Sequence, residues 1–356
     1  MGENRTGAGT RSPARGERHR AQSTIVDVAR EANVSVATVS RALNSPDRVR
    51  PETLARIKTA VSTLGFRPTS VARTLVSGRS RTVGAITPTM ENPSFALLVD
   101  AVQTTLDEAG YTLLLASSQY DAERELREVQ TLVGHGVDGL VLVGSTHHPQ
   151  LVDFISGYDI PWVTTFTSTP LGDGAFVGFD NHKAAYELTE YLLDLGHTRF
   201  GVITGRTAGN DRAAARVAGI RDAMAKRGLA LPHEGLMERP YRISDGQMAF
   251  RSIIAGATPP TAVMCGNDVL AFGALSEAHR MGLDVPGQVS ITGFDDHDFA
   301  AHLSPPLTTV RVPVTEIGKR AAEILLARLN NQVTPHHQEV EVNIIVRKST
   351  GAVARV

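Results

Sequence analysis

The chain has 356 residues, 42% of them hydrophobic and 21% charged, which is the composition of an ordinary globular protein with two or three domains. Its single cysteine, Cys265, excludes intramolecular disulfides and cysteine-rich zinc modules. The net charge of −1 conceals an asymmetry, because residues 1–81 contain 15 Lys or Arg against 6 Asp or Glu, and the remainder contains 21 against 31. A basic N-terminal part indicates contact with a polyanion, although a solvated basic tail explains the charge equally well.

The N-terminal region contains no hydrophobic segment. Residues 1–23 lack an apolar run, which excludes a secretory signal and predicts a disordered basic tail. No stretch elsewhere approaches the roughly 20 apolar residues of a membrane span. These absences, with the single cysteine, indicate a cytoplasmic protein with no membrane partner.

Residues 24–68 show helical spacing interrupted by closely placed stop signals. Thr24 and Ser35 are N-cap residues for two successive helices, with a turn at Asn33 between them. Pro51 suits the first turn of a third helix, and Gly65 suits its end. The pattern predicts a small all-α bundle.

From residue 82 onward, apolar strands alternate with amphipathic helices. The predicted strands cover residues 82–88, 111–117, 139–144, 161–166, 176–180, 199–205, 261–266, 289–294 and 307–312. The predicted helices include residues 95–109, 121–134, 182–195, 211–227, 268–281 and 315–329. This alternation predicts doubly wound parallel sheets, and its length favours two similar α/β lobes with a cleft between them.

The segment TIVDVAREANVSVATVSRALN, residues 24–44, satisfies the demands of a helix-turn-helix. The second helix of that motif enters the major groove, so it needs one apolar face and one face that reaches base edges. Val36, Ala37 and Arg41 are predicted to point outward, and only Arg41 can contact guanine with two hydrogen bonds. The predicted phosphate-binding hydroxyls are those of Ser35, Thr38 and Ser40. Spacing alone also allows a helical hairpin that contacts another protein.

Three blocks in order, IVDVAREANVSVATVSRALN, RVRPETLARI and GFRPTSVARTL, resemble the DNA-binding headpiece of the lactose-repressor (LacI/GalR) family. The resemblance implies a hinge helix within residues 69–80, and it places Ala72, Arg73 and Leu75 on DNA, with Leu75 wedged into the minor groove. Thr69 departs from the Asn usual in the family, which puts its DNA contact in doubt.

The resemblance continues to about residue 350, over the family's effector domain, which is similar to periplasmic sugar-binding proteins. It implies an effector-binding and dimerisation domain over residues 81–350, with one lobe of residues 81–180 and 313–340 and another of residues 181–312 and 341–350. The effector contacts that it implies are Ser94, Phe95, Phe166, Arg216, Tyr241, Asn267 and Asp295. These side chains suit a polyhydroxylated ligand, since Asp295 and Asn267 accept hydroxyl protons, Arg216 donates, and aromatic rings stack on a sugar.

Two features bear on the effector. Phe166 stands where many sugar-responsive members of the family carry an acid, which makes a neutral hexose a less favoured effector. The segment VGFDNHKAA, residues 177–185, resembles the gluconate-type repressors, which favours a sugar acid that Arg216 would bind.

The segment ITGFDDHDF, residues 291–299, invites a metal or catalytic interpretation. The run lacks ligands that converge from different elements, and the pairs His147-His148 and His336-His337 are predicted to lie in loops. No P-loop, G-x-S-x-G or H-E-x-x-H motif is present. We therefore expect no enzymatic activity, no metal and no cofactor, with only Asp295 of this run contacting effector.

The sequence thus predicts a homodimeric, ligand-responsive repressor of a carbohydrate or sugar-acid operon that binds a palindromic operator and is released by a small-molecule effector. Two alternatives remain open. The first is a co-repressor-dependent regulator of the purine type, and the second is a carrier-type ligand-binding protein. The C-terminal sequence STGAVARV has no leucine heptads, which favours a dimer over a tetramer.

Overall fold

A computed structural model describes residues 23–44, 46–66, 79–333 and 335–353. The chain divides into two units, with the boundary between Ser80 and Arg81. The predicted tail, apart from residue 23, and the predicted hinge residues Ala72, Arg73 and Leu75 lie outside the described residues. Within the described part of the chain, no helix combines the length and the apolar character needed to cross a membrane.

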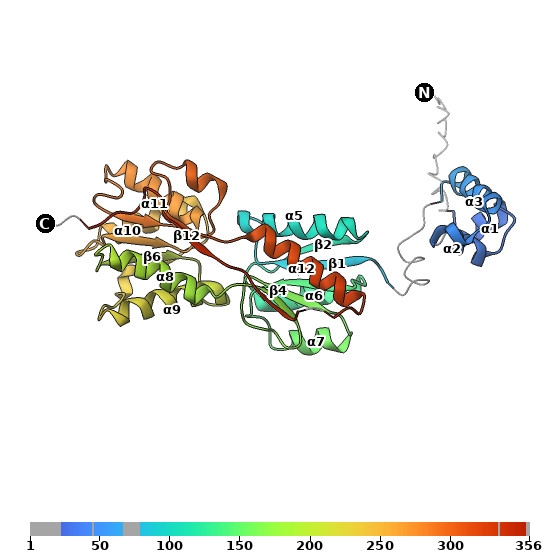
Figure 1. Ribbon diagram of the computed structural model, residues 1–356, viewed down its shortest axis with the longest axis horizontal. Coiled ribbons are helices and arrows are strands. Elements are labelled where there is room, and N and C mark those ends of the chain that lie inside the picture. Colours follow the sequence, from blue (N-terminus) through green and yellow to red (C-terminus); the bar gives the residue numbers. More distant parts are fainter. Residues whose placement is uncertain (1–22, 45, 67–78, 334, 354–356) are drawn as a thin grey trace, which may run out of the picture. The chain divides into compact units, whose positions relative to one another are not determined.

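The described part of the first unit contains three α-helices, α1 (Ile25–Glu31), α2 (Val36–Asn44) and α3 (Pro51–Leu64), with a 3-10 turn, η1 (Pro46–Arg48), before α3 (Figure 1). Thr24 Oγ1 accepts from the backbone N–H of Asp27 at 3.3 Å, while the Asp27 carboxylate accepts from Thr24 N–H at 2.9 Å. Ser35 Oγ accepts from Thr38 N–H at 3.1 Å and so caps α2. Gly65, with φ of 59°, ends α3 in the left-handed conformation that glycine adopts at low cost. The predicted helix ends are therefore confirmed.

The three helices enclose one small core. It consists of Val28, Ala29, Ala32, Val39, Ala42, Ile57, Ala60 and Phe66. The apolar faces of α1 and α2 thus pack together, which leaves the opposite face of α2 for solvent or a ligand.

The second unit holds a six-stranded parallel sheet in the order β11-β5-β4-β3-β1-β2. Its strands are β1 (Thr82–Thr87), β2 (Thr112–Ser117), β3 (Gly139–Val143), β4 (Trp162–Thr165), β5 (Ala175–Gly178) and β11 (His337–Glu339). Helices α5 (Pro93–Glu108) and α12 (Val314–Leu329) pack on one face, and α6 (Ala122–Gly134) and α7 (Leu151–Gly157) pack on the other. Successive side chains of β3 point to opposite faces of the sheet. Val141 faces α5 and α12, whereas Leu140 and Leu142 face α6 and α7.

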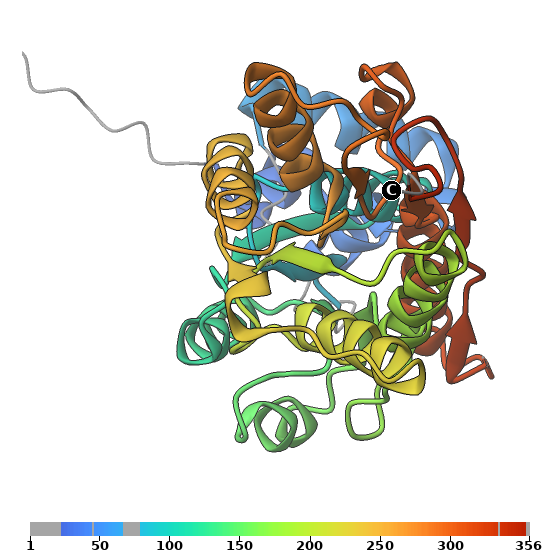
Figure 2. The ribbon, with the colours of Figure 1, turned by 90° about the vertical axis from the view of Figure 1, so that its left-hand side faces the viewer.

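A four-stranded parallel sheet, in the order β7-β6-β8-β9, forms the core of the second lobe. It contains β6 (Phe200–Thr204), β7 (Leu236–Glu238), β8 (Ala262–Cys265) and β9 (Ser290–Thr292). Helices α8 (Asn181–Asp194) and α9 (Asp211–Lys226) cover one face, and α10 (Ile243–Ile254) and α11 (Asp268–Arg280) cover the other (Figure 2). Short 3-10 turns, η2 (His233–Gly235) and η3 (Asp298–His302), precede β7 and follow β9.

The chain passes between the two sheets three times, after β5, after β10 (Thr309–Arg311) and after β11. Strand β10 pairs antiparallel with β12 (Asn343–Ile345), so two of these crossings run side by side. Each sheet is doubly wound, and ligands of such sheets bind outside the carboxyl ends of the strands. The crossings bring those ends of the two sheets to one cleft.

Several elements differ from the sequence prediction. Helices α7 and α10 and strands β7, β11 and β12 were not predicted. Each of the three strands is only three residues long, which is too short for a clear periodic pattern. His337 was placed in a loop, which is wrong. It begins β11, and its ring stacks on Phe176 with a centroid distance of 4.7 Å. The strand predicted for residues 289–294 is shorter and spans Ser290–Thr292.

Candidate functional site

The exposed face of α2 presents the residues predicted to read DNA. Val36, Ala37 and Arg41 are exposed, whereas Val39 is fully buried against α1 and α3. At about 100° per residue, the three exposed positions fall within an arc of about 140° on one side of the helix. This is the arrangement that a groove-reading helix requires.

The three predicted phosphate-binding hydroxyls differ in their surroundings. Ser35 is exposed, and Thr38 and Ser40 are half-buried. The hydroxyls of Ser35 and Thr38 lie 2.8 Å apart and share a hydrogen bond, so the first turn of α2 already holds both side chains in place.

In the second unit, all seven residues predicted to contact effector line one cavity, which we call the effector cavity. It is a narrow cavity with about 360 Å³ of empty space, part of which is open to solvent. The predicted residues at its wall are Ser94, Phe95, Phe166, Arg216, Tyr241, Asn267 and Asp295. Residues 201 positions apart, such as Ser94 and Asp295, are in direct contact there.

The topology explains this convergence. Ser94 and Phe95 open α5 after β1, Phe166 follows β4, Asn267 follows β8, and Asp295 lies just beyond β9. Each side chain therefore stands at the carboxyl end of a parallel strand, on the side of the sheet where open α/β folds bind ligands.

The run Asp295–Asp298 separates into four different environments. Asp295 is buried at the cavity wall, and its Oδ2 accepts a hydrogen bond of 3.0 Å from Ser94 Oγ. Asp296 instead forms ion pairs with Arg311 at 2.7 Å and Arg347 at 2.6 Å. Asp298 is exposed at the start of η3. Only the first aspartate is available to a ligand in the effector cavity.

His297 does not face water, because it is buried directly behind Asp295. Its Nε2 lies 3.5 Å from Asp295 Oδ2 and 3.3 Å from Ser94 Oγ. Burial alone lowers the pKa of His297, but the hydrogen bond to Asp295 and the surrounding carboxylates together raise it above its usual value. His297 thus orients Asp295, whose own backbone is held at a φ of 113°.

A further carboxyl group, that of Asp268, is hydrogen-bonded to the backbone of His297 and so supports the pair Asp295 and His297. Its Oδ2 accepts from His297 N–H at 2.8 Å, and its Oδ1 accepts from Thr309 Oγ1 at 2.6 Å. Burial first, and then the charge of Asp295, raise the pKa of Asp268 to about 7. Asp268, His297 and Asp295 therefore form one buried polar cluster at one edge of the cavity.

Arg216 and Asn267 have lost part of their hydrogen-bonding capacity to the protein. Arg216 donates to Asn181 Oδ1 at 2.9 Å and to the Gly266 carbonyl at 2.5 Å, and its guanidinium carbon lies 3.8 Å from the centre of the Phe294 ring. Asn267 Oδ1 accepts from Leu270 N–H at 2.9 Å and caps α11.

The cap uses one of the two lone pairs of the Asn267 oxygen. Its Nδ2 is buried and has no acceptor among the described residues. A buried donor without a partner costs about 1–3 kcal/mol. Asn267 is therefore prepared to donate to a ligand, and its expected role as an acceptor stays a prediction.

The sequence prediction missed four residues of the cavity wall, which are Asn92, Tyr120, Asn210 and Arg212. Asn92 and Asn210 cap α5 and α9, so helix capping was the signal that could have located them. Tyr120 has a φ of 61°, which a tyrosine rarely adopts and which no local pattern indicates.

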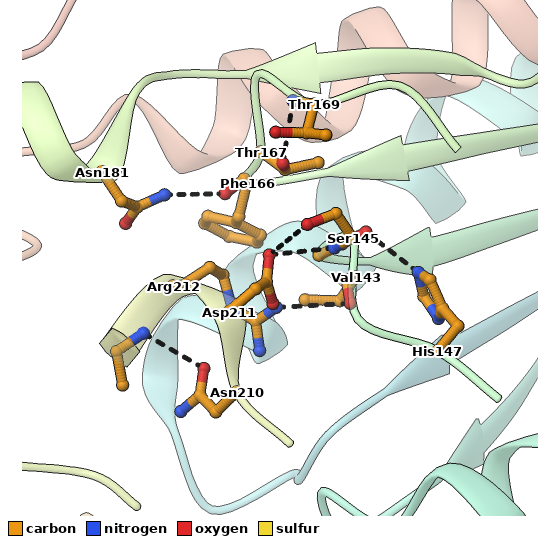
Figure 3. A network of polar contacts seen from close by, with 12 residues as sticks. Val143, Ser145, His147, Phe166, Thr167, Thr169, Asn181, Asn210, Asp211 and Arg212 are labelled. Atoms are coloured by element: carbon orange, nitrogen blue, oxygen red, sulfur yellow. Dashed lines mark hydrogen bonds and ion pairs between the residues drawn. The ribbon is translucent and has the colours of Figure 1, made fainter. Parts of the chain in front are cut away.

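Arg212 belongs to a network that joins the two lobes (Figure 3). It donates to the carbonyl of Val143 at 3.4 Å and to Asp211 at 2.7 Å. Asp211 Oδ2 in turn accepts from the N–H and the hydroxyl of Ser145 at 2.9 and 3.0 Å. The start of α9 in the second lobe is thereby fastened to the end of β3 in the first.

Among the described residues, no group of three or more His, Cys, Asp or Glu side chains is arranged to hold a metal ion. The two units instead combine a helix-turn-helix with a ligand-sized cavity between α/β lobes. Together they define a class of protein, the ligand-controlled DNA-binding regulator.

Comparisons with known proteins identify the family. Residues 24–69 match the bacterial regulatory proteins of the lacI family, and residues 189–350 match a periplasmic binding protein-like domain. The HTH-type transcriptional repressor PurR of Escherichia coli O1:K1 is 32% identical over 330 residues, which cover 92% of this chain and 96% of the relative. The chain therefore belongs to the lacI family and is a ligand-responsive transcriptional repressor.

Solved structures show the same architecture. The transcription regulator GntR from Chromobacterium violaceum has a TM-score of 0.72 and 28% identity over 76% of this chain and 99% of its own. A complex of the transcriptional regulator CelR with cellobiose has a TM-score of 0.67 and 27% identity over 92% and 100% of the two chains. These relatives are regulators of transcription.

Proposed function

We propose that this repressor responds to a polyhydroxylated small molecule, a sugar or a sugar acid, that binds in the effector cavity. The observation that carries the proposal is the buried Nδ2 of Asn267, a donor without a partner among the described residues, in the same cavity wall as the carboxylate of Asp295. A vicinal diol contains both an acceptor and a donor and satisfies the two groups together. An apolar ligand would leave the buried Nδ2 of Asn267 without an acceptor.

The other walls of the cavity suit the same ligand class. Phe95 and Phe166 meet edge to face at 5.8 Å, and Tyr241 adds a third aromatic side chain that can pack against the C–H face of a sugar ring. Arg216 supplies positive charge at the cavity wall, whereas Arg212 is ion-paired with Asp211 at 2.7 Å. Arg216 and the resemblance of residues 177–185 to gluconate-type repressors favour a sugar acid over a neutral hexose.

On DNA, Val36, Ala37 and Arg41 read bases while Ser35, Thr38 and Ser40 hold phosphates. Ala72, Arg73 and Leu75 act in the minor groove as part of a hinge over residues 69–80. The protein works as a homodimer on a nearly palindromic operator, because two-fold protein symmetry requires two related half-sites. It has no enzymatic activity, and it acts in the cytoplasm, where its DNA lies.

The two lobes provide the means of control. The effector contacts residues of both lobes, so it stabilises one relative arrangement of the lobes over others. It changes DNA binding only to the extent that its affinity differs between the DNA-competent and the incompetent arrangement. We propose that the effector favours the incompetent arrangement and releases the operator from a sugar or sugar-acid operon.

A second candidate is regulation of the purine type, in which the ligand strengthens DNA binding. The 32% identity to the repressor PurR favours it, and the aromatic walls of the cavity also suit a flat heterocycle.

One experiment separates these candidates. Thermal shift of the intact protein is measured with sugars, sugar acids and nucleobases, and each stabilising compound is then added to a gel-shift assay on operator DNA selected from random sequence. Release by a sugar or sugar acid supports the proposal. Stabilisation by nucleobases alone, with tighter operator binding, contradicts it in favour of the second candidate.

A further inference from the structure

A second and wider cavity adjoins the effector cavity, and we call it the arginine vestibule. It has about 1130 Å³ of empty space, part of which is open to solvent. Asn92, Tyr120, Asn210 and Tyr241 line both cavities, so a ligand that fills the first can extend into the second. A ligand that occupied only the effector cavity would leave this adjoining space unfilled.

The charged residues of the vestibule are Arg206, Arg239, Arg242 and Glu91. Glu91 faces Arg242 with two N–O distances of 3.2 Å, which neutralises that arginine. The guanidinium of Arg206 makes no hydrogen bond or ion pair within the described part of the chain, and that of Arg239 bonds only to the carbonyl of Glu238, at 2.9 Å. Two positive charges of the lining therefore lack a carboxylate partner.

The sheet places these two arginines side by side. Arg239 directly follows β7, Arg206 follows β6 by two residues, and the two strands pair with Thr204 opposite Glu238. Arg239 N–H donates to the carbonyl of Thr204 at 2.8 Å, which holds the backbone of Arg239 beside the end of β6. Both side chains thus come from the carboxyl ends of neighbouring parallel strands, the ligand-binding edge of such a sheet.

The lining from the first lobe is held in an unfavourable conformation. Gln119 and Tyr120 have φ values of 54° and 61°, a region that non-glycine residues adopt at a cost of about 1 kcal/mol or more each. Two consecutive residues of this kind beside a cavity point to a wall that is shaped for a ligand.

We propose that the effector carries an anionic group, a phosphate or a carboxylate, that binds Arg206 and Arg239 in the arginine vestibule while its polyhydroxylated part occupies the effector cavity. This rests on the proposed function and adds the charge and the length of the effector. The planar guanidinium group matches the oxygen pairs of both anions, whereas a neutral monosaccharide leaves the two arginines to water.

The test is calorimetric titration of the intact protein with matched probes: glucose, gluconate, glucose 6-phosphate, 6-phosphogluconate and inorganic pyrophosphate. Each is titrated into the unaltered protein, Arg206→Ala, Arg239→Ala and the double variant. Arg221→Ala is the control, because Arg221 is exposed on α9 and lines none of the described cavities. We expect at least one anionic probe to bind about tenfold more tightly than its less charged partner, and each vestibule substitution to reduce that advantage about tenfold.

The outcomes distinguish this inference from the proposed function. A neutral sugar that binds as tightly as its anionic partners and releases DNA leaves the proposed function standing and overturns the inference. The inference is also overturned if the anionic probe still binds more tightly than its less charged partner to the double variant. It is overturned as well if no anionic probe binds. Pyrophosphate binding that depends on Arg206 and Arg239, without binding by any sugar, supports the anionic site and contradicts the polyhydroxylated ligand.

Discussion

Gly144 controls whether the two lobes can dock through Arg212. It follows β3 with a φ of 86°, and a Cβ at this position would lie 1.8 Å from an Arg212 guanidinium nitrogen and 2.5 Å from the Asp211 carboxylate. Gly144→Ala must therefore displace Arg212 and Asp211 from Val143 and Ser145. Since Arg212 also lines the effector cavity, the same displacement should weaken effector binding.

Gly144→Ala is expected to lower the free energy of unfolding for two reasons. The left-handed backbone conformation costs an alanine about 1–2 kcal/mol. Loss of the charge-assisted hydrogen bonds between the lobes adds about 2–3 kcal/mol. Gly136→Ala is the matched control, because Gly136 has a similar φ of 77° but nothing within 4 Å of its added Cβ. Gly136→Ala therefore has the cost of the left-handed backbone conformation but loses no hydrogen bond between the lobes.

Thermal unfolding of the two variants separates these costs. At about 2–4 °C per kcal/mol for a domain of this size, Gly144→Ala should unfold about 5–10 °C below Gly136→Ala. Small-angle scattering should also show wider separation of the lobes for Gly144→Ala. Equal melting temperatures and equal scattering for the two variants would refute the interlobe docking inferred from Arg212 and Asp211.

The remaining predictions concern the DNA face, the effector cavity and the buried acid. Arg41→Ala should weaken binding to the selected operator by about 1–3 kcal/mol in a gel-shift titration, and an equal loss on random DNA would contradict base reading. Asp295→Ala should preserve operator binding but blunt the effector response, whereas Asp298→Asn, at an exposed neighbour, should behave as the unaltered protein. Burial and the charge of Asp295 raise the pKa of Asp268 to about 7, so the folded protein retains a proton that the unfolded chain releases near pH 4. The free energy of unfolding should therefore fall as pH rises from about 4 to 7, and Asp268→Asn should reduce that fall in urea titrations, while an unchanged pH dependence would exclude Asp268 as its source.

Local signals account for most of the predicted elements. Thr24, Ser35 and Gly65 mark helix ends through side-chain capping and glycine geometry, which act over three or four residues. The buried strands were visible because both faces of a parallel sheet are apolar. Strand β11 was not visible, because its residues HQE carry no hydrophobic pattern and its position depends on pairing with the distant strand β5.

The candidate site likewise contains features that the sequence predicts and features that only the fold decides. The seven effector residues were found through family resemblance, and their convergence on one cavity follows from a topology that spacing alone does not give. The sequence did not reveal that the oxygen of Asn267 caps α11 while its buried Nδ2 has no acceptor among the described residues. Likewise, Asp295 and Asp296 are identical neighbours with different roles, one beside Ser94 at the cavity and the other between two arginines.

The sequence by itself determined the two kinds of domain, the helix-turn-helix surface and the family, because caps, periodicity and ordered motifs are properties of neighbouring residues. Tertiary structure alone decided which side chains share the cavity, which hydrogen-bonding groups remain for a ligand, and that Arg206 and Arg239 stand together beside it. Those outcomes depend on strand pairing and lobe crossing, which bring distant residues within a few ångströms, and no local pattern encodes such distances.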